Sequence, residues 1–193
     1  MRSFYCLAFN SIRNDLMSVV DYEVDCFDLT VFWRGTPFRG AIPDKVRLYC
    51  DSVNHGPTDY VGNPLSWPIC SQKLVDIIQA MDSRDVEFFK APLFESGGNT
   101  PIPCYQVMNV IRTVSCLDLD KSKLSYSPDR SKITGVFEHV LTVDSIPSDA
   151  HIFRLQEWMH TIIVSDEMAQ AYVGKGLKGI AFIRLRSSSR MGN

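Results

Sequence analysis

The chain has 193 residues, of which 45% are hydrophobic and 22% charged, and its formal net charge is −2 at pH 7. This length and composition are typical of a folded globular protein, with one domain or two small lobes that share a core, and argue against an intrinsically disordered chain. The small net charge excludes a global basic field of the kind that recruits nucleic acid, so we expect no nucleic-acid partner.

Residues 1–64 are expected to form a small lobe of strands and loops. Residues 4–9 form an apolar run typical of a buried strand. Residues 22–32 partly alternate acidic and apolar side chains, which predicts an extended, half-exposed segment, and residues 46–50 form a further short strand. Glycine and proline residues between 55 and 64 indicate a long loop.

This lobe contains an acidic segment, in which no Lys or Arg occurs between Asn14 and Trp33. One interpretation is a solvated acidic face, and the other is a docking surface for a basic partner. In the second, the nearby aromatic side chains serve as anchors, although packing in the core, which we favour, also explains them. The segment contains Asp15 and the candidate partner-binding residues Asp21, Glu23, Asp25, Asp28 and Trp33.

Two short helices are predicted. Ser71 is a good N-cap for the first, in which Leu74, Ile77, Ile78 and Met81 form one apolar stripe. Ser165 opens the second, whose first turn carries acidic residues that favour the positive end of the helix dipole.

The remaining segments are mostly strands. We expect strands at residues 86–89, 105–114, 135–143, 152–155, 161–164 and 180–185, a hairpin-like excursion at 95–103, a polar loop at 121–132, and a flexible tail at 186–193. Two helices are too few to cover both faces of a parallel sheet. The sequence therefore predicts an α+β fold, a mainly antiparallel sheet with the two helices packed on it.

No catalytic or metal-binding motif is evident in the sequence. His55, His139, His151 and His160 have no spacing typical of a zinc site, so we expect no metal and no cofactor. The glycines at 174, 176 and 179 follow a helix, the reverse of the dinucleotide-binding order. Asp118 and Asp120 form either paired carboxylates or, as we favour, acids that cap a loop around Ser122.

The six cysteines are spread along the chain with no CxxC pair. No export signal and no apolar run of membrane-spanning length is evident. We therefore expect free thiols, a cytoplasmic location and no membrane partner.

Over residues 65–185, six segments in order resemble the immunity-protein family found beside bacterial polymorphic toxins. One element matches at Asn109, Val110, Asp118 and Ser122, a second at Ile152–Phe153–Arg154, and a third at Val164–Ser165–Asp166. The last matches at Gly176, Gly179, Ile180 and Phe182. Residues 1–64 carry no family motif and are left unassigned by the resemblance.

The resemblance implies a protein that binds and blocks a toxin encoded by a neighbouring gene, often one delivered by contact-dependent or type VI secretion. It implies no enzymatic activity, so its shared residues would define the fold: Asn109, Asp118, Asp120, Ser122, Phe153 and Arg154. We expect Arg154 to form a structural ion pair with Asp118 or Asp120. The alternative is a small cytoplasmic hydrolase or transferase whose Cys/His or Asp site is formed only in three dimensions.

Overall fold

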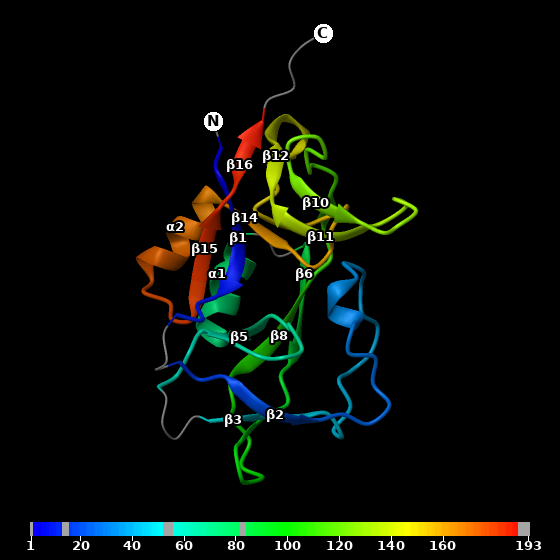
Figure 1. Ribbon diagram of the computed structural model, residues 1–193. Helices are drawn as coiled ribbons and strands as arrows, with labels where there is room; N and C mark the ends of the chain where they lie inside the picture. The colour runs from blue at the N-terminus through cyan, green and yellow to red at the C-terminus, as the bar shows by residue number, and fades with distance from the viewer. Residues whose placement is uncertain (1, 13–15, 52–55, 82–83, 189–193) are drawn as a thin grey trace.

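The computed structural model describes residues 2–12, 16–51, 56–81 and 84–188. Its largest sheet has the strands β1 (Phe4–Phe9), β9 (Thr113–Val114), β13 (Ile152–Leu155), β14 (Ile162–Ser165) and β15 (Ile180–Arg184). Their order is β15-β1-β14-β13-β9, of which β15, β1 and β14 are labelled in Figure 1. β1 pairs antiparallel with β14, where Phe4 faces Ser165, and with β15, where Phe9 faces Ile180. The first strand therefore lies between two strands from the last third of the chain.

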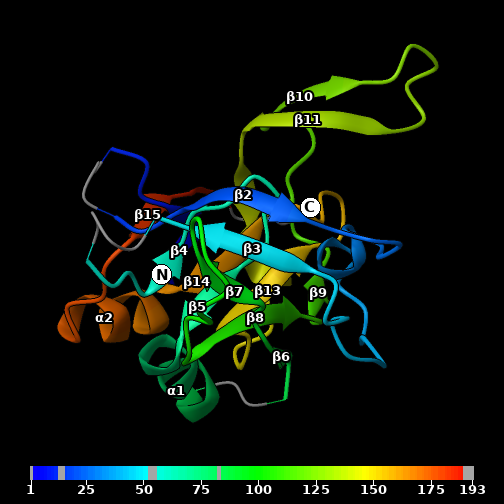
Figure 2. The ribbon, with the colours of Figure 1, turned by 90° about the horizontal axis from the view of Figure 1, so that it is seen from below.

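The two helices are α1 (Gln72–Met81) and α2 (Asp166–Gly174), as the sequence predicted. The Ser71 hydroxyl accepts a hydrogen bond from the Leu74 amide, and the Ser165 hydroxyl accepts one from Met168, so both serines act as N-caps. The helices contact each other and cover neighbouring sheets, α2 on β1 and β14 (Figure 2). The apolar side chains between them form one part of the core.

A second sheet carries α1 on β5 and β8 and has the order β4-β5-β8-β6. All its pairs are antiparallel. It consists of β4 (Tyr60–Val61), β5 (Ile69–Ser71), β6 (Val86–Lys90) and β8 (Tyr105–Val110).

A third sheet, β2 (Val19–Glu23), β3 (Arg47–Cys50) and β7 (Leu93–Glu95), has the order β2-β3-β7. β2 is antiparallel to β3, whereas β7 is parallel to it. The short helix η1 (Val31–Trp33) follows β2. A second part of the core contains Phe32 and Leu48 from residues 1–64 packed with Ile69, Leu93 and Val107 from the rest of the chain. The predicted lobe at residues 1–64 therefore shares a core with the segments that follow it.

Two small ladders complete the fold. β10 (Lys123–Tyr126) and β11 (Ile133–Glu138) form a hairpin that projects from the body (Figure 2). β12 (Val140–Thr142) pairs in parallel with β16 (Arg186–Ser188), and η2 (Val143–Ser145) follows β12. Most pairs are antiparallel, which confirms the predicted α+β class. Within the described residues, no helix is long and apolar enough to cross a membrane.

The structure corrects several predicted segments. Residues 22–32 are extended only as far as Glu23, because Cys26 has a φ of 53° and the chain turns there. The predicted strand at 105–114 divides into β8 and β9, which belong to different sheets. The predicted polar loop at 121–132 contains β10, because Leu124 and Tyr126 are half-buried and pair with β11.

The predicted tail is ordered where the structure describes it. Residues 186–188 form β16, and the Ser188 hydroxyl donates a 2.7 Å hydrogen bond to Asp118 Oδ2. Polar contacts hold this segment in place of the apolar anchors that its sequence lacks. Residues 189–193 lie outside the described residues.

Candidate functional site

β2 presents two exposed carboxylates on one face. Asp21 lies opposite Tyr49 of β3, and Glu23 lies opposite Arg47. A shallow depression lined by both carboxylates, Tyr49 and residues 96–99 lies beside them. Among the described residues, neither Asp21 nor Glu23 has an ion-pair partner. Asp15 of the same acidic segment lies outside those residues.

The other two acids of the segment are paired. Lys45 Nζ lies 2.7 Å from Asp25 Oδ2, and this contact holds the pKa of Asp25 below its usual value. Asp28 accepts hydrogen bonds from Thr30, which lower its pKa, and pairs with Arg34. Arg34 and Lys45 both lie after the acidic segment in the sequence and pair with its carboxylates in the fold. The net negative charge on this part of the surface is therefore smaller than the segment's own sequence indicates.

Trp33 is half-buried and held in place. Its indole N–H donates a 3.1 Å hydrogen bond to the carbonyl of Leu65. Its ring lies 5.3 Å from His160, which in turn lies 5.0 Å from Trp158. Phe32, one of the aromatic side chains in the acidic segment, is completely buried against Trp67, which confirms the core-packing interpretation for that residue.

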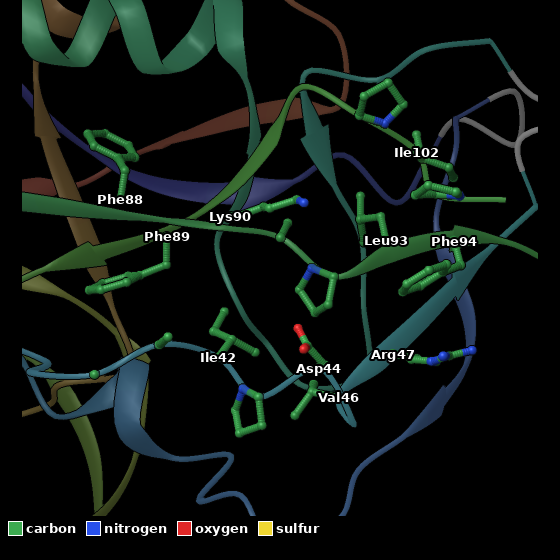
Figure 3. Close-up of a pocket in the computed structure, with 17 residues that line it drawn as sticks. Ile42, Asp44, Val46, Arg47, Phe88, Phe89, Lys90, Leu93, Phe94 and Ile102 are labelled. Carbon is green, nitrogen blue, oxygen red and sulfur yellow. The ribbon is translucent and has the colours of Figure 1, made fainter. Parts of the chain in front are cut away.

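An apolar groove of about 740 Å³ lies next to this surface. Residues 40–47, the segment from β6 into β7, and residues 101–103 form its walls, with Ile42, Val46, Phe89, Leu93 and Ile102 among the apolar side chains (Figure 3). No local sequence pattern predicts this groove, because its walls come from three separate segments. Its best sequence signal is the set of prolines at 43, 92, 101 and 103.

Three charged residues border the groove. The carboxylate of Asp44 points into it, and Lys90 lies on another part of its wall (Figure 3). The Arg47 guanidinium lies 5.1 Å from the centroid of the Phe94 ring and donates a 2.7 Å hydrogen bond to Asn99. Within the described residues, the Asp44 carboxylate has no hydrogen bond or ion pair.

The groove and the acidic strand form one continuous surface. Asp44 and Arg47 also line a smaller depression that includes Glu23 and Asp25, and Glu23 in turn reaches the depression beside Asp21. Below, "the docking surface" means this groove together with Asp21, Glu23, Asp25 and Asp44.

Asn109 connects the second sheet to the segment after η1. It is fully buried, and its amide nitrogen donates to the carbonyl of Thr36 and to Glu87 Oε2. The same Glu87 oxygen accepts a hydrogen bond from the Phe38 amide. These contacts hold residues 36–38, which lead directly into the wall of the groove.

Asp118 and Ser122 stabilise a turn. Asp118 Oδ1 accepts a hydrogen bond from the Lys121 amide, as predicted for a loop cap, and the Ser122 hydroxyl accepts one from the Val140 amide. The bond from Ser188 is the main reason that the pKa of Asp118 is lowered. Asp120 is exposed in the same turn. Phe153 is fully buried, with its ring 5.9 Å from that of Phe4.

The predicted ion pair of Arg154 with Asp118 or Asp120 is wrong. Arg154 is 1% exposed, and its guanidinium donates to the backbone carbonyls of Val110, Met159 and Phe32 at 3.1, 2.6 and 2.7 Å. Burial lowers its pKa to about 10, so the group is still charged at neutral pH. Sequence spacing could not reveal backbone acceptors, because they carry no residue-specific signal.

Four of the cysteine thiols, those of Cys6, Cys50, Cys70 and Cys116, are not activated as nucleophiles. All six cysteines are free. Burial raises the pKa of Cys6 to about 11 and those of Cys50 and Cys116 to about 12, and it raises that of Cys70 as well. A catalytic cysteine needs the opposite shift.

The histidines do not gather with acids into a metal site in the described part of the chain. His139 contacts the Thr161 hydroxyl, His151 contacts the Ser165 hydroxyl, and His160 lies by the tryptophans. His55 lies outside the described residues.

A comparison with protein-family models gives one match, which covers residues 6–187 and therefore nearly the whole chain. The description of that model is "Immunity protein family (Imm11)". The match confirms the resemblance found over residues 65–185 and extends it through most of the segment that had no assignment. Among curated proteins, none matches the chain.

Proposed function

Because the chain belongs to the Imm11 immunity protein family, we propose that it binds one cognate toxin and neutralises it in the cytoplasm of the cell that produces both. The toxin is of the polymorphic type, encoded beside the gene for this protein and delivered by contact-dependent or type VI secretion. The family match is the observation that carries this proposal. The protein acts by occupying the toxin rather than by catalysis.

The β2 strand supports a basic partner. Asp21 and Glu23 are exposed and lie two residues apart on one strand, and neither forms an ion pair among the described residues, although Arg47 lies opposite Glu23. Carboxylates in this arrangement repel each other, so a positively charged partner stabilises them. They also accelerate the encounter with a cationic protein surface. Asp25, Asp28 and Trp33 belong to the same proposed contact region. On binding, Asp25 and Asp28 replace some of their contacts with Lys45 and Arg34 by contacts with the toxin.

The raised thiol pKa values are consistent with a non-enzymatic role. A second function, as a small hydrolase or transferase, would need an activated nucleophile or a pair of perturbed carboxylates in a cleft. In the described residues, the groove has one carboxylate, Asp44, and no cysteine or histidine in its walls.

Co-expression with the neighbouring toxin tests the proposal. Cells that express the toxin alone should stop growing, and cells that also express this protein should grow normally. The two proteins should elute together in size-exclusion chromatography. The matched control is a toxin from an unrelated locus, against which this protein should give no protection. Failure to protect against the neighbouring toxin would exclude the proposed function.

A further inference from the structure

We propose that the apolar groove is the anchor pocket for the toxin. It receives one large apolar side chain from a toxin loop, and a Lys or Arg beside that side chain pairs with Asp44. This inference rests on the proposed function and deepens it, since it assigns the contact surface and the chemistry of the segment that binds there.

The shape and chemistry of the groove favour an apolar anchor. Its volume of about 740 Å³ exceeds that of a single side chain, so an anchor residue and part of its neighbours can enter. Ile42, Phe94 and Ile102 are only half-buried in the free protein, which leaves apolar surface in contact with water. Covering such a surface is the main source of affinity in the central part of protein interfaces.

The carboxylate of Asp44 favours a toxin segment in which a Lys or Arg lies next to the apolar anchor side chain. The Asp44 carboxylate points into apolar surroundings without a partner among the described residues (Figure 3). A bound segment would remove water from it, and an unpaired carboxylate would then oppose binding. A cation on the partner removes this penalty. Arg47 does not compete for this role, because it packs on Phe94 and bonds to Asn99.

Two further features favour a protein over a small molecule. The groove continues through Asp44 and Arg47 to the acidic depressions beside Glu23 and Asp21, so the complementary partner is wider than the groove itself. Lys90 lies apart from Asp44 on the groove wall. An acidic and a basic side together fix the direction in which an extended toxin segment binds.

The test uses one variant that fills the groove and one that reverses its charge. Ala41 is exposed and lines the groove, so Ala41→Trp blocks it with little cost to the fold. Asp44→Lys replaces the carboxylate with a cation. The matched controls are Ala80→Trp, on the exposed face of α1, and Asp120→Lys, in the turn before β10. Dissociation constants for the catalytically inactivated neighbouring toxin are measured by calorimetry, and melting temperatures are recorded for each variant.

Each groove variant should weaken binding by about tenfold or more, as loss of an interface anchor or a buried charge pair does. The controls should bind as the wild type does. If Ala41→Trp and Asp44→Lys both bind with wild-type affinity while the wild type protects cells, the groove assignment is wrong and the proposed function stands. If the wild type neither binds nor protects, the proposed function fails.

Amide hydrogen exchange of the wild-type protein, measured with and without the toxin, tests the assignment without a variant. Binding of the toxin should slow exchange at the amides of residues 40–42 and 44–47 and at Ile102, since the bound segment excludes water from them. Unchanged exchange at these amides in a saturated complex would overturn the assignment. Binding of a small metabolite in place of the toxin segment would overturn it as well.

Discussion

The guanidinium of Arg154 donates a 2.7 Å hydrogen bond to the carbonyl of Phe32, which lies 122 residues earlier in the chain. Its other nitrogens bond to carbonyls at the end of β8 and in the turn before β14. One side chain therefore joins η1 to two sheets. Because Arg154 is 1% exposed, water cannot replace these contacts without opening the core.

Arg154→Ala should lower the free energy of unfolding by about 3 kcal/mol, because it removes the donor from three backbone carbonyls, two of them in buried hydrogen bonds. Arg154→Lys keeps the charge but cannot reach all three acceptors, so we expect a smaller loss. Urea unfolding followed by tryptophan fluorescence measures both. An Arg154→Ala protein of normal stability that no longer binds the toxin would instead place this residue in the interface.

Reversing the charge at the two exposed acidic residues of β2 should slow association with the toxin. The double variant Asp21→Lys with Glu23→Lys breaks no ion pair among the described residues but places a cation opposite Arg47, so its melting temperature should fall slightly. Its association rate should fall by about tenfold at low ionic strength and approach the wild-type rate as salt is added. Stopped-flow mixing at several salt concentrations measures this change.

The control for this charge reversal is Asp76→Lys with Asp120→Lys, which makes the same change in net charge elsewhere. It should have a much smaller effect on the association rate. Equal slowing by both double variants would show that net charge, and not the β2 carboxylates, guides the encounter.

The native protein should have two fast-reacting thiols. Cys26 and Cys104 are exposed, whereas Cys50, Cys70 and Cys116 are buried and Cys6 is half-buried. Burial raises the pKa of each of these last four thiols, which further reduces the reactive thiolate. Titration with a disulfide reagent at pH 8 should show a fast phase from two thiols, and about six thiols after denaturation. The fast phase should disappear in the double variant Cys26→Ser with Cys104→Ser.

Stability should fall as the pH is lowered from 7 to 5, in part because of His139. Burial lowers the pKa of His139 below the value of 6.5 for an unfolded histidine. The unfolded state therefore binds the proton more tightly, and this contribution to stability is lost as pH falls through the unfolded and then the folded pKa. His139→Gln can keep a contact with Thr161 and should show a smaller loss over this range in urea titrations. A loss equal to that of the wild type would exclude a contribution from His139.

Local patterns in the sequence predicted much of the fold. The cap at Ser71, the cap at Ser165 and the apolar run of β1 involve interactions between near neighbours, and all three are present. The errors arose where distant contacts decide the structure. The strand at 186–188 depends on pairing with β12, and the end of β8 depends on which sheet the chain joins next.

The docking surface was only partly predictable, for a similar reason. The carboxylates of Asp21 and Glu23 could be located from charge patterning. The neutralisation of Asp25 by Lys45 could not, since the two residues are 20 positions apart and meet only after β2 and β3 pair. The groove depends on three segments that no local pattern connects, and the acceptors of Arg154 are main-chain atoms.

The position of β1 between β14 and β15 has a consequence for synthesis of the protein. Residues 4–9 leave the ribosome well before residues 162–184, which provide both of their neighbours in the sheet. Until those residues emerge, the nascent strand has two unsatisfied edges and needs a chaperone or transient contacts to shield it. Contacts across so long a stretch of chain also slow folding. Protection against the proposed toxin would therefore begin only after residues 162–184 have been translated, which favours making this protein before the toxin that it blocks.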